Sequence, residues 1–183
     1  MTCIVGSVDK KNNSVVIGGD SASSGGSNIF VRKDPKVFNN GEFIIGCTTS
    51  FRMIQLLRFS FIPPDINSKE IYEYMCTDFI TAVRTCFKDG GYLQTYTAGD
   101  EKGGNFLVAY KNRLFKIETD FQVAENLNGI DAVGCGADFA LGALHSIADQ
   151  EIPVEEKILK ALEAAEFLAS GVCSPFIIKS TFK

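Results

Sequence analysis

The first twenty residues, MTCIVGSVDKKNNSVVIGGD, constrain the fold of this chain more than any other stretch. Two apolar runs flank the polar loop 9–13, and this pattern predicts a β-hairpin. An antiparallel register closed by that loop pairs Val8 with Ser14. The same register places Asp20 directly opposite Thr2, so we expect a carboxylate beside the hydroxyl of the second residue.

Thr2 would carry both a hydroxyl and a free α-amine if Met1 were removed. An α-amine has an ordinary pKa of about 8, so near neutral pH it can take the proton of its own hydroxyl, as in N-terminal-nucleophile catalysis. A nearby cation would lower that pKa, and Lys36, held by Asp20, could supply it. Lys33 is the competing lysine. The alternative is that Thr2 simply begins a strand, as β-branched residues often do.

Composition argues against several classes of protein. The 183 residues fit a single domain, 1–183, with a full hydrophobic core. The net charge of −4 and the lack of a Lys/Arg cluster argue against a nucleic-acid partner. No apolar segment approaches the roughly 20 residues of a membrane span, and no signal-peptide pattern opens the chain. We therefore expect a cytoplasmic protein without a membrane partner.

Other residues that could carry chemistry have simpler interpretations. The six cysteines form no CxxC or CxxH pair, so we expect reduced thiols and no zinc site. Cys3 faces away from Thr2 on its strand and is expected in the core. His145 lies in an apolar helical pattern without a G-x-S-x-G motif, which favours packing over a catalytic triad. The turn 134–136, Gly-Cys-Gly, lacks the third glycine of a dinucleotide site.

The first half of the chain is predicted to contain strands followed by helices. A loop, a strand, a hairpin and a helix are expected at 18–28, 29–31, 37–46 and 50–59. The loop is rich in Gly and Ser but lacks the GK[ST] ending of a phosphate cradle, so we expect it on the substrate side. Asn67 and Glu70 have the spacing of a capping box for a helix that runs to about Lys88 and stops at Gly90.

The second half repeats that order. Strands are expected at 105–110, 113–118, 121–125, 130–134 and 172–182, with a tight turn at 111–112. Two helices precede the last strand, one at 137–148 and one with Pro153 in its first turn and Gly171 at its end. Groups of strands separated by pairs of helices predict an α+β fold, in which two stacked sheets carry helices on both outer sides.

Several short motifs resemble those of a single protein family. They are T-x-I-V at 2–5, VVIGGDS at 15–21, the dipeptide Lys36-Val37, FIIGCTTSFRMIQLL at 43–57, AVGCGADFALGAL at 132–144 and ASGVC at 169–173. With the sixteen-residue step from Asp20 to Lys36, they resemble the proteasome β-subunit family. The resemblance spans nearly the whole chain and is strongest to the bacterial ATP-dependent branch, the HslV-type peptidases.

The resemblance implies a four-layer αββα sandwich of two mainly antiparallel sheets. It also implies a threonine-type endopeptidase in which Thr2 is the nucleophile, Asp20 and Lys36 tune its amine, and a backbone N–H at Thr48 or Thr49 holds the oxyanion. No cofactor is implied for the chemistry. A monovalent or divalent cation is implied at carbonyl groups near the last strand, and the matching residues are Ser170, Cys173 and Phe176. The implied partners are a polypeptide substrate, further copies of the chain in stacked rings, and an AAA+ ATPase unfoldase.

Four residues, in three segments, depart from the family pattern. Thr48 and Thr49 replace small residues of the turn, Cys135 replaces a serine before a helix, and Gly171 replaces an aspartate near the last strand. The last two changes remove polar neighbours of the Thr2 amine. Two alternatives therefore stay open: a non-catalytic ring or scaffold subunit, and an N-terminal-nucleophile amidase that acts on a small amide.

Overall fold

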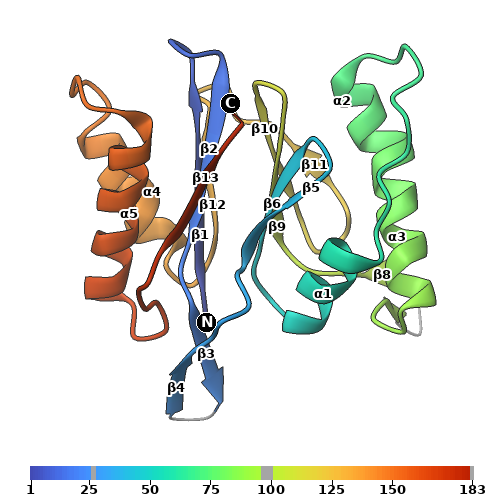
Figure 1. The fold of residues 1–183 in the computed structure, drawn as a ribbon, viewed down its shortest axis with the longest axis horizontal. Helices are drawn as coiled ribbons and strands as arrows, with labels where there is room; N and C mark the ends of the chain where they lie inside the picture. The colour runs from blue at the N-terminus through green and yellow to red at the C-terminus, as the bar shows by residue number, and fades with distance from the viewer. Residues whose placement is uncertain (26–27, 96–100, 182–183) are drawn as a thin grey trace.

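The computed structural model describes residues 1–25, 28–95 and 101–181. Two β-sheets stack face to face, and helices cover the outer side of each sheet (Figure 1). Every strand pairing in the described part of the chain is antiparallel. The predicted αββα sandwich is therefore confirmed.

The first sheet contains both ends of the chain. Its strands, in the order β12-β1-β2-β13, are Ile130–Gly134, Cys3–Asp9, Ser14–Gly19 and Ile177–Ser180. Helices α4 (Ala137–Ser146) and α5 (Val154–Leu168) cover its outer face (Figure 1).

The second sheet follows the order β11-β10-β9-β6-β5. Its strands are Val123–Ala124, Arg113–Ile117, Phe106–Tyr110, Phe43–Cys47 and Val37–Asn40. The outer layer consists of α1 (Phe51–Phe59) and a long helix made of α2 (Ile71–Tyr74), the π-turn η1 (Met75–Phe79) and α3 (Ile80–Asp89). Two short pairs stand apart: β3 (Ala22–Gly25) with β4 (Asn28–Val31), and β7 (Gln94–Thr95) with β8 (Glu101–Lys102).

Three hydrophobic clusters hold the layers together. One lies between the first sheet and α4 and α5, and includes the fully buried Cys3. A larger one, rich in phenylalanine, lies between the second sheet and its helices. The third fills the space between the sheets with aliphatic side chains such as Ile4, Ile17 and Leu114. Burial of this apolar surface is the main force that stabilises the stack.

The register of the first hairpin differs by one residue from the prediction. Val8 pairs with Val15, not Ser14, and Ile4 pairs with Gly19. Asp9 extends the strand, because its carboxylate accepts the N–H groups of the next turn and leaves a four-residue loop in place of five. Continued to its end, this register places Cys3, not Thr2, opposite Asp20.

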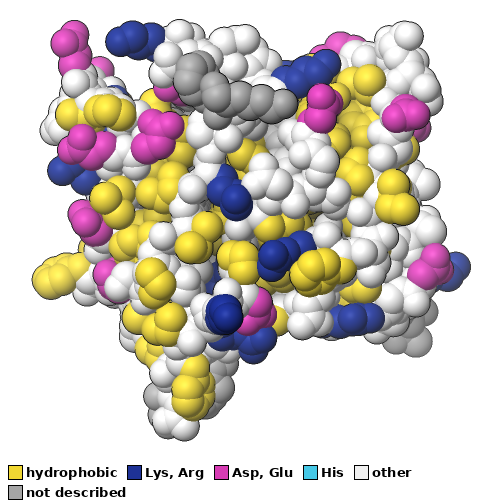
Figure 2. Space-filling model, in the orientation of Figure 1, with side chains coloured by type: hydrophobic (Ala, Val, Ile, Leu, Met, Phe, Trp, Pro, Cys, Tyr) yellow, Lys and Arg dark blue, Asp and Glu magenta, His cyan; other side chains and the backbone are white. Residues whose placement is uncertain are grey.

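The stretch 18–28 is not a simple loop, so that prediction is wrong. Its first residues complete β2, and β3 pairs with β4 to form a hairpin that projects from the end of the sandwich near the N-terminus (Figure 1). The sequence of β3, Ala-Ser-Ser-Gly, did not predict a strand, because it lacks the β-branched and aromatic residues that favour strands. Figure 2 shows several hydrophobic side chains on this projection. Ile29, Phe30 and Val31 of β4 are exposed.

The capping box at Asn67 is also wrong. Asn67 and Ser68 both have positive φ, and the long helix begins only at Ile71. Glu70 is its N-cap, because the Glu70 carboxylate accepts the N–H groups of Tyr72 and Glu73.

The later elements are confirmed with shorter ends. Helix α4 stops at Ser146, α5 stops at Leu168 rather than Gly171, and the last strand begins only at Ile177. The residues before it include Pro175, which has no N–H for a strand ladder. The predicted end of this strand, at residue 182, lies outside the described residues. None of the described helices has the length and apolar character needed to cross a membrane.

Candidate active site

Four segments distant in sequence meet at the end of the sandwich where the N-terminus lies (Figure 1). Thr2 immediately precedes β1, Asp20 follows β2, Lys36 precedes β5, and Thr49 lies in the turn between β6 and α1. The stacking of the two sheets therefore brings the first two residues, from one sheet, to the other two.

Lys36 joins Thr2 to Asp20. Its Nζ donates to Thr2 Oγ1 at 2.9 Å and to Asp20 Oδ1 at 2.9 Å. The Lys36 and Asp20 side chains are 2% and 0% exposed, so the ion pair is shielded from water. The predicted contact between Thr2 and Asp20 is thus made through a lysine and not through the hairpin register.

Asp20 is held by backbone groups on several sides. Its carboxylate accepts the N–H groups of Cys3 and Ala22, each at 2.9 Å, and that of Cys173 at 3.4 Å. Hydrogen bonds of this kind stabilise the charged form of a buried carboxylate. These hydrogen bonds therefore fix the position of the Asp20 carboxylate beside the Lys36 ammonium.

Burial lowers the pKa of Lys36 from its ordinary value, and the Asp20 carboxylate opposes that shift. An ammonium placed 2.9 Å from the Thr2 hydroxyl stabilises negative charge on that oxygen. The exposed Lys33 lies outside this network. The structure therefore places Lys36, and not the competing lysine, beside Thr2.

Met1 covers the Thr2 nitrogen. The Thr2 hydroxyl donates to the Met1 carbonyl oxygen at 2.5 Å, and Lys36 Nζ lies 3.5 Å from the same oxygen. The Met1 side chain lies against Gly171, where an added Cβ would come within 2.0 Å of it. While Met1 is attached, the Thr2 nitrogen belongs to a peptide bond and cannot act as a base.

The turn that carries Thr49 leaves one backbone donor free. The N–H groups of Cys47, Thr48 and Ser50 already donate to backbone carbonyl oxygens at 2.7–3.2 Å. Thr49 has φ +63°, and its hydroxyl accepts the N–H of Asn105. The Thr49 N–H donates no hydrogen bond within the described residues, so it is available to a bound molecule.

A cavity of about 100 Å³ connects these groups. Its lining includes Thr2 and Lys36 on one side, Thr48 and Thr49 on another, and Ser23 from the projecting hairpin. A nucleophilic hydroxyl, a buried cation and a free backbone donor thus face one small space. This combination is suited to acyl transfer.

The resemblance implies that Cys135 lies near the Thr2 amine, and in the structure Cys135 contacts Thr2. The Thr2 N–H donates to Cys135 Sγ at 3.3 Å. A cysteine in a glycine-flanked turn after a strand was the available signal. By contrast, His145 is exposed on α4, away from these four residues in sequence and layer.

The implied cation site would consist of backbone carbonyl oxygens. The Cys173 carbonyl oxygen accepts the Ser21 N–H at 3.0 Å and has a second lone pair. Within the described ranges, no group of three or more His, Cys, Asp and Glu residues that could hold a metal adds to these carbonyl groups. We assign the cation no role, and Ser170, Cys173 and Phe176 stay a prediction.

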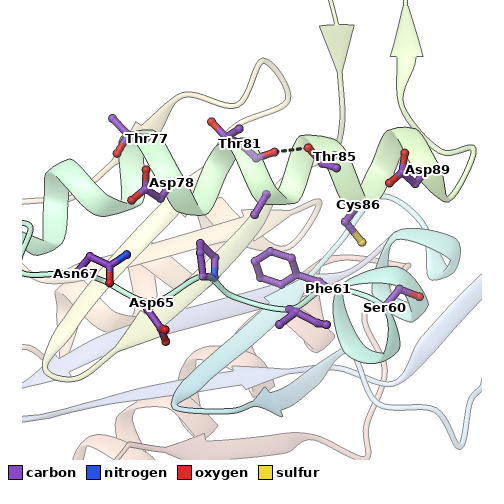
Figure 3. A pocket seen from close by; sticks show the side chains of 13 residues that line it. Ser60, Phe61, Asp65, Asn67, Thr77, Asp78, Thr81, Thr85, Cys86 and Asp89 are labelled. Carbon is purple, nitrogen blue, oxygen red and sulfur yellow. Dashed lines mark hydrogen bonds between the residues drawn. The ribbon is translucent and has the colours of Figure 1, made fainter.

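A larger cavity, of about 720 Å³, lies in the outer layer between the long helix and segment 60–67 (Figure 3). Its polar groups are largely committed elsewhere: Asp78 pairs with Lys69, and the Thr85 hydroxyl donates to the Thr81 carbonyl oxygen. No nucleophile and base are paired among its lining residues, so the smaller cavity beside Thr2 is the better candidate active site.

Comparisons with known proteins agree with this fold. No protein-family model and no curated protein sequence matches the chain. Among solved structures, BPH from Thiobacillus denitrificans, in complex with epoxomicin, has a TM-score of 0.79 at 19% identity, with 97% of each chain covered. Eukaryotic HslV from Trypanosoma brucei has a TM-score of 0.67 at 20% identity, with 97% of this chain and 98% of that chain covered.

A third structure, a Gly-1 mutant of Anbu from Hyphomicrobium sp. strain MC1, has a TM-score of 0.69 at 14% identity. It covers 100% of this chain and 83% of the other. Because these neighbours are HslV-type, proteasome-like proteins, the chain has the fold that its sequence motifs imply.

Proposed function

We propose that this chain, which has the fold of the HslV-type proteasome-like proteins, is a threonine-type peptidase that uses the hydroxyl of Thr2 after Met1 is removed. The observation that carries the proposal is the buried ammonium of Lys36, 2.9 Å from Thr2 Oγ1 and 2.9 Å from Asp20. Burial of a lysine ammonium costs free energy unless the charge is paired. A buried lysine that also contacts a hydroxyl group is therefore a candidate functional residue.

The chemistry follows from these groups. The free α-amine of Thr2 takes the proton of the Thr2 hydroxyl, and Oγ1 attacks the carbonyl carbon of the substrate. The Lys36 ammonium stabilises the developing alkoxide, and the Thr49 N–H donates to the oxyanion. The amine then passes its proton to the leaving amine, so the peptide C–N bond breaks and an ester to Thr2 forms. Water hydrolyses that ester and restores the hydroxyl.

The substrate and partners belong to the same proposal. The proposal includes polypeptide substrates, a homo-oligomeric ring, an AAA+ ATPase unfoldase and a cytoplasmic location, and the likeness in fold to HslV-type proteins supports it. The net charge argues against a nucleic-acid partner, since the chain carries 18 Lys and Arg against 22 Asp and Glu.

The test uses protein whose N-terminal Thr2 is established by intact mass. A peptide epoxyketone has two electrophilic carbons, so a 1,2-amino alcohol can close a ring with it. We expect one adduct at Thr2 and hydrolysis of an unfolded polypeptide. Thr2→Ala abolishes the adduct and lowers turnover at least about 1,000-fold. Lys36→Ala lowers turnover about 100-fold or more, whereas Lys33→Ala, at the exposed lysine, leaves turnover unchanged.

Three outcomes would assign a different function. Absence of an adduct on protein with a free Thr2 amine would favour the non-catalytic ring or scaffold subunit. An adduct together with hydrolysis of small amides but not of polypeptides would assign the amidase. Full turnover in Thr2→Ala would refute the nucleophile altogether.

A further inference from the structure

The turn between β6 and α1 has a strained backbone at Thr49. The Ser50 N–H donates to the Thr48 carbonyl oxygen at 2.7 Å, which closes a three-residue γ-turn with Thr49 at its centre. Thr49 has φ +63°, a conformation that β-branched residues rarely adopt, and a γ-turn with positive φ at its centre is the rare, strained form. Such strain persists only where neighbouring residues hold it in place.

The start of β9 supplies those neighbours. The ladder between β6 and β9 ends at the pair Cys47–Phe106. In the same register the next pair is Thr48 with Asn105, and the Thr48 N–H donates to the Asn105 carbonyl oxygen at 3.2 Å. The Thr48 carbonyl oxygen is already engaged within the γ-turn. The Asn105 N–H therefore donates to Thr49 Oγ1 instead, at 3.2 Å, so a side-chain hydroxyl takes the place of a backbone acceptor.

Gly104 packs against the same side chain. A Cβ at Gly104 would lie 2.9 Å from both Cβ and Oγ1 of Thr49, and 2.8 Å from Met53 Sδ. A Cβ cannot approach other atoms so closely, so glycine is what lets this strand reach the Thr49 side chain. The family pattern has a small residue where this chain has Thr49. The contacts of the Thr49 side chain are thus a property of this chain and not of the pattern.

These contacts leave the Thr49 N–H unused. Within residues 1–25, 28–95 and 101–181 it donates no hydrogen bond, and Thr49 lines the cavity beside Thr2. We propose that the Thr49 hydroxyl, through its hydrogen bond with the Asn105 N–H, is a positioning group that holds the Thr49 N–H ready for the anionic oxygen of a tetrahedral adduct on Thr2. This role rests on the proposed function, and it names the side chain that keeps the oxyanion donor in place.

The role has a kinetic signature. A donor that is fixed before the reaction stabilises developing charge without reorganisation. The carbonyl oxygen of a bound substrate is uncharged, whereas that of the transition state is anionic. Loss of the Thr49–Asn105 hydrogen bond should therefore lower kcat and leave KM nearly unchanged.

The experiment compares wild type with five variants, all processed to a free Thr2: Thr49→Val, Thr49→Gly, Thr49→Ser, Gly104→Ala and Thr85→Val. The valine keeps the shape of Thr49 but cannot accept a hydrogen bond, the glycine also removes the strain, and the serine keeps the hydroxyl. Gly104→Ala pushes against an unchanged Thr49. Thr85→Val is the matched control, because the exposed Thr85 loses a hydroxyl hydrogen bond in α3, in the outer helical layer.

Three measurements are made on each protein, besides the urea midpoint. The first is kcat and KM for a peptide. The second is the affinity for a peptide boronate: Thr2 Oγ1 adds to boron, one B–O bond forms, the hydroxyl proton passes to the α-amine, and the boron becomes a tetrahedral anion. The third is hydrogen exchange of the segment that contains Asn105, read by mass spectrometry.

In Thr49→Val we expect kcat and boronate affinity to fall at least about tenfold, KM to stay within about twofold, and the Asn105 segment to exchange faster. Gly104→Ala should lower kcat in the same direction. Thr49→Gly should show the same losses with a urea midpoint no lower than that of wild type, because glycine adopts positive φ without strain. Thr49→Ser should restore kcat to within about threefold of wild type, and Thr85→Val should leave kcat unchanged.

Three results would overturn the inference: wild-type kcat in Thr49→Val, kcat values that simply follow the urea midpoints, or equal exchange of the Asn105 segment in wild type and Thr49→Val. If no protein hydrolyses peptide but the boronate binds wild type at least about tenfold more tightly than Thr49→Val, the proposed function fails and the role of Thr49 stands. If the boronate also binds the two proteins equally, both fail.

Discussion

Lys36 is the residue whose position requires most explanation. Taking an ammonium and a carboxylate out of water costs several kcal/mol each, of which their attraction recovers only a part. The Lys36–Asp20 pair is nevertheless almost wholly buried, and three backbone N–H groups complete the shell of Asp20. An apolar pair of similar volume would serve packing at least as well. The proposed function accounts for this buried pair, because Lys36 contacts Thr2 Oγ1.

The pH dependence of turnover follows from this burial. Burial lowers the pKa of Lys36 below its ordinary value of 10.5, although Asp20 opposes the shift. The protonated form stabilises the Thr2 alkoxide, so kcat/KM falls as pH rises through the Lys36 pKa. We expect that alkaline limb below pH 10.5. It should be unchanged in Lys33→Ala and displaced to higher pH in Lys36→Arg, because arginine keeps its proton. An identical limb in Lys36→Arg would assign it to another group.

The residues of the candidate active site were predictable from the sequence to different degrees. Thr2 and Asp20 stand at the ends of a hairpin, and Lys36 follows from the family spacing, so all three converge as expected. The contacts among them were harder to predict, because the hairpin register depends on how the Asp9 carboxylate accepts the N–H groups of its turn. The position of Cys135 near Thr2 came from the resemblance alone, because Cys135 follows β12, and a strand pairing between residues 3 and 134 has no local signal.

At the scale of elements, the long outer helix shows how a local signal can mislead. Asn67 and Glu70 have the spacing of a capping box, yet the chain turns through positive φ at Asn67 and Ser68. Glu70 then becomes the cap itself, and its carboxylate also pairs with Arg113 of β10. A tertiary ion pair thus helps to fix where the helix begins.

Substitution of the true cap should therefore cost stability, and substitution of the expected one should not. Glu70→Ala removes the acceptor of two helix N–H groups, so we expect it to lower the free energy of unfolding. Asn67→Gly suits the positive φ at that position, so no loss is expected. Urea unfolding at constant pH measures both. A larger loss in Asn67→Gly than in Glu70→Ala would restore the capping box.

Elements with strong periodicity were predictable, and elements fixed by neighbours were not. The apolar stripe of the long helix predicts its course, but not the π-turn η1, since both kinds of turn can bury Met75 and Phe79. The β3–β4 hairpin has no apolar alternation in its first strand. It is anchored instead by the Ser21 hydroxyl, which donates to the Pro175 carbonyl oxygen from the far end of the chain.

At the scale of the whole molecule, the site exists because the two sheets approach closely. Thr2 and Asp20 belong to the ends of strands in one sheet, whereas Lys36 and Thr49 flank strands of the other. The space between the sheets is filled by aliphatic side chains, and at Gly46 it has no room for more. A Cβ at Gly46 would lie 2.5 Å from Ile4 Cγ2 and 3.0 Å from Ile17 Cγ2.

Gly46→Ala should therefore push the sheets apart and displace the residues of the candidate active site. Ile4 and Ile17 are fully buried, so neither can move away freely, and overpacking of this kind costs about 1–3 kcal/mol. Ile4 is two residues from Thr2, and Gly46 is three from Thr49, so we also expect turnover to fall. The control is Gly142→Ala in α4, where an added Cβ meets nothing within 4 Å; it should raise stability by about 0.5–1 kcal/mol, because alanine favours helix. The measurements are the urea midpoint and the turnover of both variants. If Gly46→Ala has the same midpoint as the unsubstituted protein, or loses stability without losing turnover, the spacing of the sheets does not position the proposed catalytic groups.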